Sequence, residues 1–178
     1  MVMLLSGWKQ AAREIFDGKR FRENYKNYLL LSFLILVSIG LVLLLHELLG
    51  GIIVASLGAS SFILFVRPHA SSTCTRNIAG SYVCASVVGI LFSLLHDRLF
   101  VLDFAGVDYA LVVVCAAAAA VTAFLMVAAN LVHPPAAALA VGLSADSDCL
   151  RTAAVAIIGV VIFCVIRRVL KKHLKNLI

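Results

Sequence analysis

One stretch of the sequence decides the fold, namely Asn130-Leu131-Val132-His133-Pro134-Pro135-Ala136-Ala137-Ala138-Leu139-Ala140-Val141-Gly142. Tandem proline cannot lie inside a regular helix, because each proline lacks the backbone N–H that the helix needs. Proline is favoured in a first helical turn, and alanine is the strongest helix former. We therefore predict that one helix ends near Asn130 and that a short new helix begins at Pro134 or Pro135. Gly142 is expected to end the new helix.

The composition places this break inside a membrane protein. Hydrophobic residues make up 63% of the 178 residues, charged residues only 13%, and the mean hydropathy is +1.08. A soluble domain needs a larger polar surface than this sequence can provide. The expected fold class is therefore an all-α membrane protein, a polytopic bundle. A broken helix survives in a bilayer only when buried in protein or lining a watery cavity, so the break indicates a transport path.

Apolar runs divide the chain into six predicted segments, of which two are short. Long runs cover 28–45, 76–95, 109–130 and 151–166, and short runs cover 50–66 and 133–142. Six crossings result, and an alternative with four spans makes both short segments re-entrant. The transmembrane domain is expected at 27–170, between an amphipathic segment at 1–26 and a basic tail at 171–178.

The net charge of +6 is concentrated at the two ends of the chain. Basic residues such as Lys19 and Arg20 precede the first span, and Arg167 and Arg168 end the last one. This pattern follows the positive-inside rule and predicts that both termini are cytoplasmic. It gives no reason to expect a nucleic-acid partner.

A weak internal repeat appears at an offset of 75 residues. Residues 64–79 match 139–154 in the order apolar helix end, polar loop, Cys-x-Arg and next span. The same offset aligns 58–60 with 133–135, so we expect a second helix break near Gly58. Inverted 3+3 repeats with paired broken helices are a known transporter architecture.

The break carries the first group of candidate binding residues. The free N–H groups of Ala136 and its successors would attract an anion at the start of the helix that follows Pro134-Pro135. Asn130 and His133 can donate hydrogen bonds to the same anion. In the alternative, Asn130 merely caps the preceding helix and His133 bonds to a backbone carbonyl.

The second group lies in the two segments before the break. Arg76 and Asn77 open a span and could attract an anion, although arginine at such a place also snorkels to lipid headgroups. Ser60 and Ser61 could line the expected second break. Arg151 is expected to be structural, because neighbouring aspartates can neutralise it.

Other chemistries find little support in the sequence. No nucleophile–base pair is visible, so we expect no enzyme activity, and we expect no cofactor. The five cysteines are odd in number and include no C-x-x-C pair, which favours a role as small apolar residues. The spans carry no acid apart from an interfacial Glu47, which argues against a carboxylate-based cation pump.

The sequence resembles the HPP family of integral membrane proteins. His133-Pro134-Pro135-Ala136 matches the family's name-giving motif, and 57–61 and 76–80 resemble its other two signatures, so the resemblance covers roughly 50–166. It implies a small-anion permease, with nitrite as the first candidate substrate. We expect the protein to lie in a bacterial inner membrane. The expected partners are a small inorganic anion, membrane lipids and further copies of the chain in a homo-oligomer.

Two other functions remain open at this stage. The protein could transport a neutral solute, or a soft metal ion bound by Cys74, Cys84 and His69. It could instead be a non-transporting scaffold whose basic ends bind anionic lipid or a protein partner.

Overall fold

The computed structural model describes residues 54–98, 103–104 and 107–171, together with 25–27, 29–30, 32–37, 39–40 and 44. The expected amphipathic segment at 1–26 and the basic tail at 171–178 lie outside the described residues, apart from Tyr25, Lys26 and Lys171. The predicted first span at 28–45 is helical at every position that is described.

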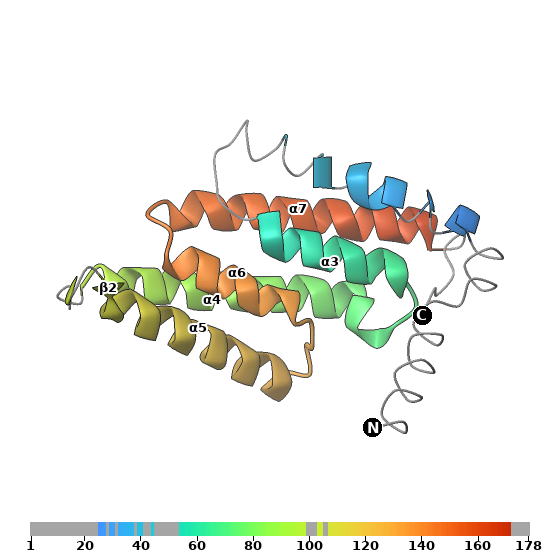
Figure 1. Ribbon diagram of the computed structural model, residues 1–178. Helices are drawn as coiled ribbons and strands as arrows, with labels where there is room; N and C mark the ends of the chain where they lie inside the picture. The colour runs from blue at the N-terminus through green and yellow to red at the C-terminus, as the bar shows by residue number, and fades with distance from the viewer. Residues whose placement is uncertain are drawn as a thin grey trace, which may run out of the picture.

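The described chain forms a bundle of α-helices, which confirms the expected fold class (Figure 1). The elements are α3 (Val54–Val66), η1 (Ser71–Thr73), α4 (Thr75–His96), β1 (Asp103–Phe104), β2 (Val107–Asp108), α5 (Tyr109–Ala128), α6 (Pro135–Ser144) and α7 (Cys149–Leu170). Helices α4, α5 and α7 are long and apolar enough to cross a membrane. Strands β1 and β2 form a minimal antiparallel hairpin in the connector between α4 and α5.

Helix α6 lies at the centre of the bundle, among α3, α4, α5 and α7 (Figure 1). Its side chains Ala136, Leu139, Ala140 and Leu143 are all fully buried. Small residues let neighbouring helices approach closely, and a Cβ placed on Gly89 of α4 would lie 2.6 Å from the Cβ of Leu143. The alanine-rich sequence after the two prolines is therefore the packing core of the bundle.

The segment that contains α6 crosses the bundle although its helix has only ten residues. Near the start of α4, the Ser81 hydroxyl donates to the Leu131 carbonyl. Near the end of α4, the Ser93 hydroxyl donates to the Asp146 carbonyl at 3.3 Å. These two contacts lie about 18 Å apart along α4, so residues 131–146 run from one end of the bundle towards the other. The segment therefore continues along α4 in one direction, which favours the crossing over the re-entrant alternative.

The two ends of the bundle carry opposite charge. One end, here called the basic end, holds the turn from α3 to α4 and the end of α7, with Arg67, Arg76 and Arg167. The other, here called the acidic end, holds the α4–α5 connector and the α6–α7 turn, with Asp146 and Asp148. At the acidic end Arg151 lies 3.9 Å from Asp148, which confirms the expected local neutralisation of this arginine.

The outer surfaces of the long helices are apolar. Val87 of α4, Phe124 of α5 and Val161 of α7 are 53%, 72% and 55% exposed. Large apolar side chains at this exposure on every long helix are expected where lipid, rather than water, surrounds the protein. The chain is an integral membrane protein, and the apolar exposed faces of its long helices fit that setting.

The pairs α3–α4 and α6–α7 run in opposite directions, as an inverted repeat requires. Helix α3 ends at the basic end and α6 ends at the acidic end, and each is followed by a 22-residue helix. The expected second break near Gly58 is wrong, because α3 runs through this residue without interruption. A single helical glycine costs only about 1 kcal/mol, whereas tandem proline removes backbone donors outright.

The contact between α4 and α6 yields a stability prediction. Gly89→Ala places a Cβ 2.6 Å from Leu143 Cβ and 3.0 Å from the Ala140 carbonyl, atoms that cannot swing away. We expect the substitution to lower the free energy of unfolding by about 1–3 kcal/mol. Gly142→Ala is the control, because nothing lies within 4 Å of its Cβ position, and it should stabilise α6. Thermal unfolding in detergent measures both, and equal melting temperatures would contradict the close packing of α6.

Candidate functional site

The break begins with a left-handed cap at the end of α5. Asn130 has φ 52°, a conformation that asparagine tolerates better than most residues. Its N–H donates to the Val127 carbonyl at 3.1 Å, and the Leu131 N–H donates to the Met126 carbonyl at 2.8 Å. These are the two bonds of a Schellman motif. The backbone of Asn130 therefore has the capping role that the sequence left open.

The start of α6 is closed by its own backbone. The Ala136 N–H donates to the His133 carbonyl and the Ala137 N–H to the Pro134 carbonyl, each at 3.0 Å. The prediction that these N–H groups are free for an anion is therefore wrong. The chain tightens into i→i−3 turns around the two prolines, which satisfies these donors locally. The helix also continues past Gly142 to Ser144.

His133 is fully buried directly before the prolines and is bonded through both ring nitrogens. Nδ1 lies 3.1 Å from the Ser72 carbonyl and Nε2 lies 2.8 Å from the Ser60 hydroxyl. Because a carbonyl can only accept, Nδ1 carries the proton in the neutral ring and Nε2 accepts from Ser60. The Ser60 oxygen lies 2.7 Å from the Tyr82 hydroxyl, which then donates to it.

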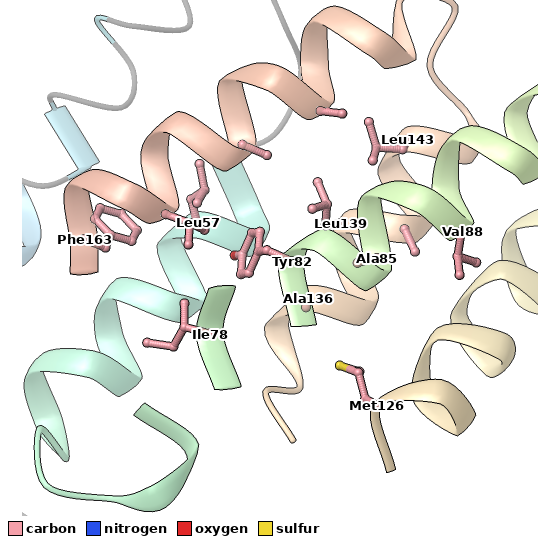
Figure 2. Close-up of a cluster of buried hydrophobic side chains, with 14 of the residues drawn as sticks. Leu57, Ile78, Tyr82, Ala85, Val88, Met126, Ala136, Leu139, Leu143 and Phe163 are labelled. Atoms are coloured by element: carbon pink, nitrogen blue, oxygen red, sulfur yellow. The ribbon is translucent and has the colours of Figure 1, made fainter. Parts of the chain in front are cut away.

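This network, here called the His133 network, joins His133 and Ser72 to Ser60 of α3 and Tyr82 of α4. Figure 2 shows Tyr82 within the apolar cluster, close to Leu57. The sequence analysis missed Tyr82, because a tyrosine inside a span resembles any other large apolar residue. The signal that could have found it is the run of hydroxyl residues around it, Ser81 before and Ser86 after.

Beside the network, an open cleft of about 440 Å³ lies at the basic end. It is lined by Ser71, Ser72, Cys74, Arg76, Asn77, Asn130 and Val132. Three predicted site residues therefore line one cleft. Arg76 and Asn77 come from the first turn of α4, and Asn130 comes from the break. Ser72 belongs to both the cleft and the His133 network, so its backbone separates the cleft from the buried histidine.

The cleft is rich in hydrogen-bond donors and positive potential. Helix α4 begins here without a side-chain cap and without an acidic residue in its first turn. No side-chain cap therefore satisfies its first N–H groups, and the helix dipole makes this end of α4 positive. The Asn77 amide donates one hydrogen bond to the Ser71 carbonyl at 3.0 Å, which leaves its second N–H. Within the described part of the chain, Arg76 has no carboxylate partner.

The wall of the cleft is held from beneath by two buried side chains. The Thr73 hydroxyl donates to the Ala70 carbonyl at 2.7 Å. The Arg167 guanidinium, only 7% exposed, donates to the Pro68 carbonyl at 2.8 Å through Nη2 and at 3.3 Å through Nε. Sequence reasoning counted Arg167 only among the terminal basic residues, because its partner is a distant backbone atom. The loop is thus fixed before any ligand arrives.

The remaining predicted site residues have local roles. The Ser61 hydroxyl donates to the Gly58 carbonyl of its own helix at 2.8 Å. Pro134 is exposed and Pro135 and Ala136 are buried, and none of the three lines the cleft. Among the described residues no three His, Cys, Asp or Glu side chains come together, so the metal-ion alternative gains no support from them.

One comparison with known proteins found a match, to the model of a protein family. The family model described as "HPP, transmembrane region" matches residues 21–177, a range that includes the cleft and the His133 network. No curated protein matches the chain, and no solved structure matches it.

The His133 network yields a prediction about Ser60. Ser60→Ala leaves both the His133 Nε2 and the Tyr82 hydroxyl without their shared partner in a fully buried site. We expect a loss of about 1–3 kcal/mol in the free energy of unfolding. Its neighbour Ser61 is equally buried but bonds only to its own helix, so Ser61→Ala should cost clearly less. Thermal unfolding of both variants in detergent checks the difference; equal losses would mean that the network does not hold α3.

Proposed function

The chain belongs to the HPP transmembrane family, and from this premise and the cleft we propose that it transports small monovalent anions, nitrite first among them. The observation that carries the proposal is the uncapped start of α4, which opens beside Arg76 into a cleft lined by amide groups. A cation, a helix N-terminus and amide donors all favour negative charge. The absence of any acid in the first turn of α4 leaves that preference unopposed.

The cleft is large enough to receive an anion with its water. Its volume of about 440 Å³ corresponds to about fifteen water molecules at the ~30 Å³ that each occupies in the liquid. An entrance of this size needs no dehydration, so attraction and not fit governs binding there. We propose that selection between anions takes place beyond the cleft, at His133.

His133 lies at the point where the entrance meets the bundle interior. Its Nδ1 bonds the Ser72 carbonyl, and Ser72 lines the cleft. In the proposed mechanism an anion enters beside Arg76 and Asn130 and displaces this carbonyl. The anion then accepts the hydrogen bond that Nδ1–H had donated to Ser72. His133 would then act as the gate, and a protonated ring would couple anion passage to a proton.

The location proposed for the protein follows from the same charges. By the positive-inside rule we propose that the basic end faces the cytoplasm, which would make both termini cytoplasmic. The membrane that we propose is a bacterial inner membrane. Transport of this kind involves no covalent step and no cofactor. A homo-oligomer would shield polar parts of each copy from lipid. A neutral-solute carrier would show no uptake that depends on the charge of Arg76, and a lipid-binding scaffold would show no nitrite uptake, which separates these alternatives from the proposal.

Nitrite uptake into liposomes that contain the purified protein tests the function. Arg76→Gln removes the cation of the cleft, and we expect uptake to fall about tenfold, because a hydrogen bond to a charged group contributes about 1.5–3 kcal/mol. Arg151→Gln is the control, since Arg151 is exposed, paired with Asp148 and at the acidic end. Absence of uptake by the unaltered protein would overturn the function, and equal loss in both variants would overturn the role of the cleft.

Asn130 allows its capping role to be separated from a binding role. Asn130→Gly keeps the left-handed conformation at φ 52° and removes only the amide. We expect this variant to retain its thermal stability while nitrite uptake falls several-fold. Asn130→Ala should lose stability as well, by about 1–2 kcal/mol. Full uptake by a stable Asn130→Gly protein would restrict Asn130 to capping.

A further inference from the structure

The last turn of α7 contacts the loop that joins α3 to α4 and forms the wall of the cleft (Figure 1). Arg167 of α7 is buried, and its guanidinium donates to the Pro68 carbonyl through Nη2 at 2.8 Å and through Nε at 3.3 Å. Removing a cation from water is costly, so a buried arginine bonded to a single carbonyl requires an explanation.

The Pro68 carbonyl depends on Arg167 because the other donor near it is shared. The Thr73 hydroxyl lies near three carbonyls of the loop, at 2.7 Å from that of Ala70, 3.1 Å from that of Arg67 and 3.3 Å from that of Pro68. A hydroxyl has one proton to donate, and the nearest acceptor is Ala70. The Arg67 and Ala70 carbonyls each accept a backbone N–H as well, whereas in the described part of the chain the Pro68 carbonyl accepts none outside the helices. Arg167 is therefore its principal donor.

The same loop carries the carbonyl that His133 bonds. Ser72 lies in η1, directly before Thr73, and its carbonyl accepts the hydrogen bond from His133 Nδ1 at 3.1 Å. The turn is built on the Ala70 carbonyl, which accepts from the Thr73 N–H at 3.2 Å and from the Thr73 hydroxyl. A displacement of Pro68 would therefore reach Ser72 through one short turn.

We propose that Arg167 is a positioning residue for His133, which fixes the Pro68 carbonyl, holds the Ser72 carbonyl on Nδ1 and thereby keeps the proposed gate closed. This inference rests on the proposed function, in which an anion displaces that carbonyl. Arg167 is not among the residues that line the cleft, so it acts through the loop. Because the carbonyl and the anion compete for one N–H, the firmness of the loop sets how readily the anion binds His133.

Two variants loosen the loop and two serve as controls. Arg167→Lys removes the planar fork of donors and keeps the positive charge. Thr73→Val removes the buried hydroxyl beside the same carbonyls and nearly keeps the shape of the side chain. Arg168→Lys is the matched control, since Arg168 is the next residue of α7 and is exposed. Ser93→Ala is the second control, because it removes a hydroxyl-to-carbonyl bond at the acidic end, far from the loop.

The first measurement is independent of transport. Diethyl pyrocarbonate modifies accessible, unprotonated histidine rings, and mass spectrometry of the purified full-length protein in detergent gives the rate at His133. This ring is fully buried and bonded through both nitrogens, so the wild-type rate should be low. We expect the rate to rise several-fold in Arg167→Lys and Thr73→Val and to stay unchanged in both controls. Wild-type rates in the two loop variants, or an equal rise in the controls, would overturn the inference.

The second measurement is the maximal rate of nitrite uptake into liposomes at saturating nitrite. We expect this rate to rise several-fold in Arg167→Lys and Thr73→Val, because the Ser72 carbonyl then competes less with the anion for Nδ1–H. A merely structural role for Arg167 would give a loss, so reduced uptake in both loop variants would overturn the closing role. No uptake by the wild-type protein would overturn the proposed function and the gate with it, and the modification rates would still decide whether Arg167 positions Ser72 on His133.

Discussion

The fold depends on one constraint, that backbone groups at membrane depth must find partners within the protein. The break between α5 and α6 meets it in three ways. The left-handed Asn130 returns its own N–H and that of Leu131 to the end of α5. The Ser81 hydroxyl donates a hydrogen bond to the Leu131 carbonyl. The N–H groups of Ala136 and Ala137 donate to the carbonyls of His133 and Pro134, three residues earlier. Because these groups are satisfied locally, the N–H groups at the start of α6 are not available to an anion, and the proposed binding role falls to the cleft beside the break.

His133 makes the break part of the tertiary structure. Its ring has one fixed donor and one fixed acceptor, because the Ser72 carbonyl dictates which nitrogen carries the proton. The ring therefore connects the cleft wall, through Ser72, with α3, through Ser60. Loss of the bond to Ser72 would free the His133 ring, and the hydrogen bonds that join it to Ser60 and Tyr82 would then change as well.

Local chemistry was predictable from the sequence, and distant partners were not. Proline geometry is a property of two adjacent residues, so the end of α5 and the start of α6 came out correctly. Asn130 and Arg76 were singled out as candidate binding residues because an amide and a cation are rare in such an apolar chain, and both line the cleft. The sequence could not show that the open helix start is that of α4 rather than α6, since closure depends on i→i−3 bonds around Pro134. Tyr82 was missed because its significance comes from a contact with α3.

The inverted arrangement relates the N-terminus of α4 to the N-terminus of α7, and the two differ in their surroundings. Each has an arginine in its first turn, Arg76 in α4 and Arg151 in α7, separated by the 75 residues of the repeat. At the acidic end Asp148 lies 3.9 Å from Arg151 and cancels its charge. At the basic end the corresponding position is Thr73, whose hydroxyl instead fixes the loop. The basic end therefore keeps an arginine without a carboxylate partner among the described residues, and the two loops differ by an acid at one position and a hydroxyl at the other.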